Sequence, residues 1–297
     1  MSAAASLRAR LAEAGAHGAA AFAGLGAAWT YLRARPVRGP RPRIGLGGVV
    51  EFLSLAVLIV SLVAASMILL DPLSPYLRAQ LPLEVIRFFE RITDLGLGGV
   101  VLWPIGLCLL VVLAMKSRLD DMGRRIAAAV TARLGFLFLS IAGAGLFVLV
   151  LKYLLGRARP HAALLLAGPH PQFTFDWLAL KANFASFPSG HSAVVFSTAA
   201  AFGALFPRSR VPLACIAVLV ASSRIVLGSH YPSDVLAGGA IATAFVLMMV
   251  KLFAARRLVF CVAPDGAISP MPGPTPRRLA RLMAPAAAPP ALEEARS

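Results

Sequence analysis

The chain has 297 residues, 59% of them hydrophobic, and its mean hydropathy is +0.79. Because these values lie far above those of soluble domains and the apolar residues form long runs, the composition excludes an ordinary soluble globular protein and indicates a membrane protein. The net charge of +16 does not indicate nucleic-acid binding, since the basic residues gather in loops and tails and no known nucleic-acid-binding motif is present.

The two termini lie outside the predicted membrane domain of residues 45–257. Residues 1–44 form a basic, alanine-rich segment without a leucine-rich run and cleavage site, so we expect no cleaved signal peptide. Residues 258–297, which include "PMPGPTPRRLARLMAPAAAPP", are rich in proline and alanine. We expect them to form a disordered tail, and we expect both termini to be cytoplasmic.

Uncharged runs long enough to cross a bilayer recur along the membrane domain. Residues 95–115 are uncharged throughout, whereas the last three runs have polar residues at their ends. The fold class that we predict is all-α, a polytopic membrane protein with a bundle of six transmembrane helices. The predicted spans are 49–70, 95–115, 134–151, 190–207, 211–229 and 233–253.

One segment between the first two spans has a different pattern. In "LPLEVIRFFERITD", residues 81–94, Val85, Phe88, Phe89 and Ile92 follow the spacing of one helix face, and the charged residues occupy the other face. This pattern is typical of an amphipathic helix lying on the membrane surface. The alternative is a helix packed on another protein domain.

The distribution of basic residues predicts the orientation. With six spans, one side of the membrane holds both termini and the 116–125 and 207–210 loops, and it carries twenty of the 29 Lys and Arg residues. The other side carries eight, and Arg133 lies in the third span, near its start. Because the side richer in basic residues is cytoplasmic, the other loops should face the extracytoplasmic side.

Polar residues gather at four helix ends, all on the predicted extracytoplasmic face. They lie at the exit of the third span, the entrance of the fourth, the exit of the fifth and the entrance of the sixth. In chain order they are Lys152 and Arg159, then Pro188 to His191, then Ser223 and Arg224, then His230 and Asp234.

Together these ends hold three cations, two histidines and one carboxylate, a balance that favours an anion. Arginine recognises phosphate oxygens with several planar donors, and lysine adds a point charge. Ser189 and Gly190 directly precede a helix, whose free N–H groups and dipole favour an anion, and glycine allows a close approach. The implied ligand is a phosphate group.

Two histidines suggest chemistry beyond binding, because one can attack phosphorus while the other protonates the leaving oxygen. Asp234 follows His230 by four residues, so its carboxylate could fix the imidazole tautomer. We expect no metal and no cofactor, since no carboxylate cluster is present to hold magnesium.

Each feature taken alone has a simpler interpretation. Lys152 could extend its amine to the membrane surface, "PSGH" could be a helix cap formed by Ser189, and the His230 region could be a polar helix boundary. Arg224 is harder to explain in this way, because it lies among apolar neighbours in "LVASSRIVLGS". A charge at that depth is costly and indicates function.

Three segments together resemble the signature of the type-2 phosphatidic acid phosphatase superfamily, K-x6-R-P, P-S-G-H and S-R-x5-H-x3-D. The chain has "KYLLGRARP" at 152–160, "PSGH" at 188–191 and "SRIVLGSHYPSD" at 223–234. All eleven fixed positions match in order within 83 residues, and the two termini lie outside the resemblance.

The resemblance implies a role for each matched residue. His230 resembles the nucleophile that becomes phosphohistidine, Asp234 its orienting partner, and His191 the general acid. The phosphate clamp would consist of Lys152, Arg159, Ser189, Gly190 and Arg224. The implied activity is metal-independent hydrolysis of a lipid phosphate or diphosphate ester.

The predicted location suggests several substrates. The composition is typical of a GC-rich bacterial genome, so we expect the bacterial plasma membrane and an outer-face lipid such as undecaprenyl diphosphate, phosphatidylglycerophosphate, phosphatidic acid or a lipid A phosphate. Aromatic residues between Pro160 and Phe187, including Phe173, Trp177 and Phe184, suit a membrane interface. A small packed extracytoplasmic loop is the alternative.

Other activities remain open. The phosphohistidine could pass its phosphoryl group to a second lipid instead of water, which would make the protein a phosphotransferase. The vanadate-dependent haloperoxidases use a similar pocket, but they are soluble. A transporter or scaffold would leave the matched residues unexplained.

Overall fold

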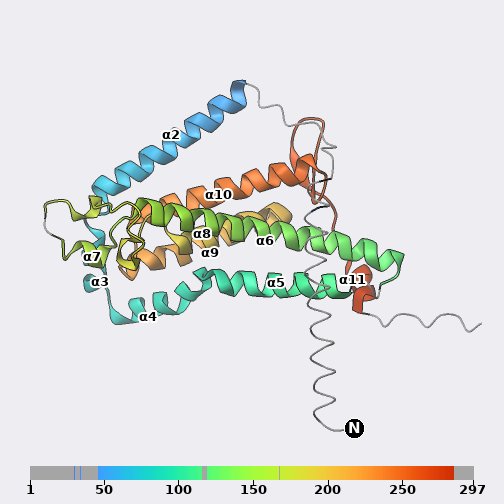
Figure 1. The fold of residues 1–297 in the computed structure, drawn as a ribbon, viewed down its shortest axis with the longest axis horizontal. Helices are drawn as coiled ribbons and strands as arrows, with labels where there is room; N and C mark the ends of the chain where they lie inside the picture. The colour runs from blue at the N-terminus through green and yellow to red at the C-terminus, as the bar shows by residue number, and fades with distance from the viewer. Residues whose placement is uncertain (1–29, 31–33, 35–45, 116–118, 167, 284–297) are drawn as a thin grey trace, which may run out of the picture. The chain divides into compact units, whose positions relative to one another are not determined.

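The computed structural model describes residues 30, 34, 46–115, 119–166 and 168–283. Over these residues the chain is helical apart from connections and one two-stranded hairpin (Figure 1). It divides into two compact units, and the unit formed by residues 37–105 and 136–270 contains every predicted site residue. Its structure is described below by itself.

The elements follow one another with short connections. In chain order they are α2 (Leu46–Leu69), α3 (Ser74–Gln80), α4 (Leu83–Ile92), η1 (Thr93–Gly96), α5 (Gly98–Met115), α6 (Asp121–Leu155), α7 (Pro160–Ala163), η3 (Pro171–Phe173), η4 (Ala182–Phe184), α8 (Gly190–Leu205), η5 (Pro207–Ser209), α9 (Arg210–Val226), α10 (Pro232–Ala255), β1 (Phe260–Val262), β2 (Ile268–Pro270) and α11 (Pro276–Met283).

Several helices can cross a membrane by length and composition, so the all-α polytopic membrane fold is confirmed. Among the described residues there are five, namely Gly48–Leu69, Leu83–Met115, Asp121–Leu155, Pro207–Val226 and Pro232–Ala255. The predicted count of six is not confirmed. The helix expected over 190–207 has only 16 residues, because Pro207 cannot donate the hydrogen bond that would extend it.

Small side chains form the packed core around the site. α8, α9 and α10 lie side by side (Figure 1), and α2 packs on α10. Two buried clusters hold the helices together, one of Val195, Ala217, Val220, Ala221 and Val235, the other of Ala144, Val148, Ala193 and Ala242. Alanine and glycine allow helix backbones to approach closely where the hydrophobic effect cannot drive association in lipid.

A glycine sets the distance between the start of α8 and α10. A Cβ atom on Gly238 would lie 2.4 Å from the backbone oxygen of Ser189, closer than any side chain can approach. The backbone N–H of Ser189 also donates to the carbonyl oxygen of Asp234 at 2.9 Å. The first turns of two helices carrying predicted site residues therefore meet directly.

The amphipathic segment is helical, as the spacing predicts. α4 packs against α9, and an ion pair of 3.3 Å between Arg78 and Glu90 joins α3 to α4. Phe88 remains exposed. Its place on the membrane surface stays a prediction, whereas its continuation into η1 brings Thr93–Gly96 against α8 and α9.

Part of the tail that we expect to be disordered has regular structure. β1 and β2 pair antiparallel, with Phe260 opposite Pro270. Phe260 is buried, and its ring lies edge-on to Phe136 at 4.9 Å between centroids. The proline- and alanine-rich composition of the tail does not reveal that one aromatic side chain, Phe260, is buried and fixes the hairpin in place. Residues 284–297 and nearly all of 1–44 lie outside the described residues.

Candidate active site

The structure brings the predicted site residues together at helix ends. Lys152 lies in the last turn of α6, Arg224 in the last turn of α9, and His191 in the first turn of α8. The side chain of His191 interacts electrostatically with Arg224, His230, Lys152 and Arg159. Four segments separated in sequence thus converge around one histidine.

His230 and Asp234 form the most buried pair of this group. Nδ1 of His230 lies 3.4 Å from Oδ2 of Asp234, and the two side chains are 2% and 0% exposed. The same carboxylate oxygen accepts hydrogen bonds from the Ser186 hydroxyl at 2.5 Å and the Tyr231 backbone N–H at 2.9 Å. Because Nδ1 faces an acceptor, it carries the proton, and the lone pair of the neutral ring is left on Nε2.

The surroundings of His230 keep its imidazole neutral. Burial lowers the pKa of His230 to about 4, and the positive charges of Lys152 and Arg159 act in the same direction, while Asp234 opposes them. A neutral imidazole at physiological pH retains the lone pair that nucleophilic attack requires. An imidazole that is already neutral would need no separate base to act as a nucleophile.

Two of the three predicted clamp cations carry buried donors without partners among the described residues. Among the described residues, the buried Nε atoms of Arg159 and Arg224 have no hydrogen-bond acceptor. Burial lowers the pKa of Arg159, which Asp234 partly offsets. Burying unpaired cationic N–H groups is costly unless an anion accepts from them. This arrangement suits a phosphate group with several oxygens.

The start of α8 faces this cluster. A Cβ atom on Gly190 would lie 3.4 Å from Nζ of Lys152, so the lysine amine sits next to the first turn of the helix. The hydroxyl of Ser189 accepts from the backbone N–H of Ser192 at 3.4 Å. The cap that the simpler interpretation of "PSGH" predicts is therefore present, and it lies beside the cations.

The segment η1 lies against two predicted site residues, Arg224 and His191. Sequence reasoning did not predict this contact. Oγ1 of Thr93 lies 2.9 Å from both Nη1 of Arg224 and the Ser223 hydroxyl. A Cβ atom on Gly96 would lie 2.8 Å from the His191 ring. The signal in the sequence is indirect, namely a threonine and a glycine directly after an amphipathic helix.

Sequence reasoning also missed a buried charge cluster behind Asp234. Arg157 is fully buried and contacts two carboxylates, Asp234 at 2.6 Å and Asp71 at 2.7 Å. Burial raises the pKa of Asp71, while its contacts with Ser233 and Arg157 lower it. The available signals were the acid directly after the first apolar run and the first arginine of "GRARP".

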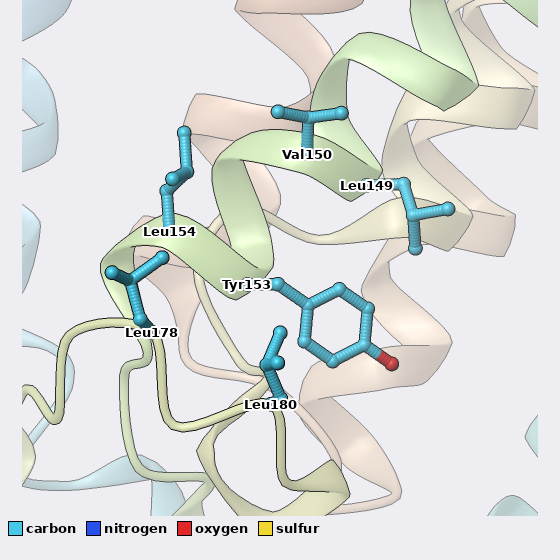
Figure 2. A pocket seen from close by; sticks show the side chains of 6 residues that line it. All are labelled: Leu149, Val150, Tyr153, Leu154, Leu178 and Leu180. Atoms are coloured by element: carbon cyan, nitrogen blue, oxygen red, sulfur yellow. The ribbon is translucent and has the colours of Figure 1, made fainter.

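An apolar groove of about 310 Å³ opens beside the end of α6 (Figure 2). It is lined by Leu149, Val150, Tyr153, Leu154, Leu178 and Leu180. Leu178 and Leu180 have φ angles of 61° and 49°, a left-handed conformation that is costly for a side chain other than glycine. Tyr153 interacts electrostatically with Arg159, so the groove adjoins the cationic cluster.

The loop that carries these leucines combines both sequence interpretations. Phe184 packs against the buried cluster of Ala158, Ala163 and Tyr231, as a packed loop requires. Trp177, in contrast, is 69% exposed, as an interfacial aromatic residue would be.

Comparisons with known proteins identify the family of the chain. The model of the PAP2 superfamily matches residues 133–258. The chain is 35% identical over 211 residues to a protein named Lipid A 1-phosphatase from Rhizobium etli, covering 70% of this chain and 87% of that protein. A protein of the same name from Rhizobium johnstonii is 34% identical over 205 residues, or 69% and 82% of the two chains. No solved structure matches the chain significantly.

Proposed function

Because the chain belongs to the PAP2 superfamily and is a membrane lipid phosphatase, we propose that it removes the 1-phosphate group of lipid A through a phosphohistidine at His230. The observation that carries the proposal is the buried pair of His230 and Asp234, at 3.4 Å, beside cations with unpaired donors. The similarity to two proteins named Lipid A 1-phosphatase supports this substrate above the other lipid phosphates.

In the first step, the clamp holds the phosphate group. Lys152, Arg159 and Arg224 neutralise its oxygens, and the first turn of α8 adds backbone N–H donors. Preorganised donors stabilise the charge of the transition state, because they need not reorient during the reaction. A bound dianion beside His191 also favours the protonated form of that imidazole.

In the second step, Nε2 of His230 attacks phosphorus and the bond from phosphorus to the lipid oxygen breaks. His191 donates a proton to that oxygen, so the lipid leaves as an alcohol. Asp234 holds the Nδ1 proton of His230 and stabilises the positive charge that the ring acquires. In the third step, His191 takes a proton from water, which attacks the phosphohistidine and releases phosphate.

The groove beside α6 supports a lipid substrate. Its lining is apolar, and Tyr153 adjoins the clamp residue Arg159. One acyl chain next to the headgroup would lie along Leu178 and Leu180 (Figure 2). In a bilayer such a groove selects among chains by shape, since the surrounding lipid is equally apolar.

The substrate is tested with purified protein and a panel of four lipids, namely lipid A, undecaprenyl diphosphate, phosphatidylglycerophosphate and phosphatidic acid. We expect the fastest phosphate release from lipid A, with loss of the 1-phosphate by mass spectrometry, and no release by the matched variant His230→Gln. Faster turnover of another lipid would contradict lipid A as the substrate and identify that lipid in its place. Transfer of labelled phosphate to a second lipid would establish the phosphotransferase alternative, which the comparisons do not favour.

We also propose that the site faces the periplasm, on the basis of the excess of basic residues on the opposite side. In a cysteine-free background, a membrane-impermeant thiol reagent should label Leu165→Cys in spheroplasts and should leave Ser209→Cys unlabelled. The opposite labelling pattern would place the reaction in the cytoplasm.

A further inference from the structure

Arg157 uses every donor of its guanidinium group within the protein. Nε donates to the backbone oxygen of Gln172 at 3.0 Å. Nη1 donates to the Ser233 hydroxyl at 2.7 Å and to Oδ1 of Asp234 at 2.6 Å. Nη2 donates to Oδ2 of Asp71 at 2.7 Å and to Gln172 at 2.9 Å. Since arginine has five N–H groups, none remains for a phosphate.

Asp71 holds the other side of this arginine. Its carboxylate accepts from the backbone N–H of Ser233 at 3.1 Å and from the Ser233 hydroxyl at 2.5 Å. It lies directly after α2, while Ser233 lies in the first turn of α10. The contact therefore attaches the end of the first membrane helix to the helix that carries Asp234.

The two oxygens of Asp234 have separate partners. Oδ1 receives Arg157, whereas Oδ2 faces Nδ1 of His230 and accepts from Ser186 and Tyr231. A carboxylate that is held at one oxygen presents the other in a defined direction. This division matches what a nucleophilic imidazole needs from its orienting partner.

The nearby clamp makes such a restraint necessary. Arg159 and Lys152 both interact electrostatically with Asp234. If the carboxylate were free to rotate, it could pair with a clamp cation, which would weaken phosphate binding and release His230. Two carboxylates share the single charge of Arg157, so Asp234 is restrained while the cluster retains a net negative charge for the imidazole.

We propose that Arg157 and Asp71 are positioning residues for the nucleophile, in which Asp71 fixes Arg157 and Arg157 directs Asp234 toward His230. This inference rests on the proposed phosphohistidine mechanism. It assigns a function to the loop after α2 and to the first arginine of "GRARP", both outside the signature residues. Neither residue contacts the phosphate.

The test begins with Arg157→Lys, since lysine retains the charge and loses the planar fork. We expect kcat to fall by about 10- to 100-fold, with KM changed by less than about threefold, because supporting partners of this kind have effects of that size. Single-turnover formation of the acid-labile phosphoenzyme should slow by the same factor. The matched control Arg78→Lys, whose arginine pairs with the exposed Glu90, should leave both constants unchanged.

A double-mutant cycle distinguishes positioning from general stabilisation. If Arg157 acts through Asp234, then Arg157→Lys should cost almost nothing further in an Asp234→Asn background. If the two losses multiply, the arginine acts independently and the proposal is overturned. Thermal unfolding in detergent identifies variants that fold.

Asp71→Asn supplies a second variant if Arg157→Lys does not fold. It removes one charge without changing shape, and we expect a roughly tenfold lower kcat with little change in KM. Wild-type kcat in a folded variant of either residue, or a raised KM at unchanged kcat, overturns the proposal. Failure of the wild type to form a phosphoenzyme at His230 overturns the mechanism and this inference together, whereas a normal wild-type phosphoenzyme with unaffected variants overturns the inference alone.

Discussion

Arg157 and Arg159 lie two residues apart in the connection between α6 and α7, yet their surroundings are opposite. Every N–H group of Arg157 has an acceptor within the protein, including two carboxylates. Arg159 has a buried Nε without a partner among the described residues, and its interaction with Asp234 is only electrostatic. Arg157 is saturated, in the sense that all its donors are paired within the protein, and Arg159 is open, in the sense that it keeps an unpaired donor in the described part of the chain.

If the proposals above hold, one loop carries an arginine that restrains Asp234 and an arginine that binds phosphate. A saturated buried cation contributes to geometry, because breaking its contacts leaves charges unpaired. A buried cation with unpaired donors is unfavourable by itself and gains most from an anionic ligand. Variants of the two arginines should therefore differ in which kinetic constant they change.

The largest loss of activity should follow removal of the proposed nucleophile, His230, whose reaction both arginines are proposed to support. His230→Ala should lower kcat on the order of 10⁴-fold or more and abolish the acid-labile phosphoenzyme, since neither arginine can replace the attacking nitrogen. Phosphate release and acid-quench labelling measure this. Near-normal phosphate release by a folded His230→Ala protein would contradict a phosphohistidine mechanism at His230, and with it the roles assigned to both arginines.

His191→Ala should have a smaller effect that depends on the leaving group. On a lipid phosphate we expect a loss of about 10²- to 10⁴-fold, because the departing alcohol needs a proton. On an activated aryl phosphate the loss should be much smaller, since that group leaves as an anion. Comparison of the two substrates checks the assignment, and equal losses would contradict a general-acid role.

Arg159→Ala should lower kcat/KM by about 10²- to 10³-fold through loss of a phosphate donor. Unlike Arg157→Lys, it should also weaken inhibition by vanadate, which resembles phosphate in geometry. Inhibition constants for both variants measure the contrast directly. If the two variants weaken vanadate equally, the distinction between the open and the saturated arginine is wrong.

The smallest effect should be on pH dependence. Because the pKa of His230 is lowered to about 4 in the folded protein, against about 6.5 when unfolded, the unfolded state binds this proton more tightly. This difference costs no stability above pH 6.5. As the pH falls from 6.5 to 4 it lowers the free energy of unfolding, by roughly 3 kcal/mol in all. Melting curves over this window should show a smaller acid-dependent loss for His230→Gln.

Arg159→Gln sharpens the same measurement. Its charge is one of the lesser causes of the lowered pKa, after burial, so the variant should raise the pKa of His230 only slightly. The acid-dependent loss of stability should shrink a little, and Arg78→Lys should leave it unchanged. An acid-dependent loss of stability as large as in the wild type would show that the charge of Arg159 does not affect the pKa of His230.

Much of the site could be predicted because its chemistry is carried by rare residue types at fixed spacing. Lys152, Arg224 and His230 are polar residues beside long apolar runs, where a charge is costly without a function. The four-residue spacing of His230 and Asp234 keeps the two close at the start of α10, and the structure has them in contact, His230 just before the helix and Asp234 in its first turn. Helix alternation then brings the four helix ends to one face.

Other features depended on packing between distant segments. The ordered hairpin after α10 reflects the buried Phe260, which packs on Phe136 and which composition does not reveal. Thr93 reaches Arg224 across 131 positions. None of these pairings leaves a periodic pattern in the chain.

The sequence by itself determined the membrane class, the long apolar helices and the residues of the signature, because hydropathy and local spacing follow directly from residue order. Only the tertiary structure decided which of two neighbouring arginines has all its donors paired within the protein and which keeps a donor unpaired among the described residues. Asp71 and Asp234 lie 86 and 77 positions from Arg157, and they meet it where the end of α2 reaches the start of α10. A buried charge is open or saturated according to its partners in space, and residue order does not specify those partners.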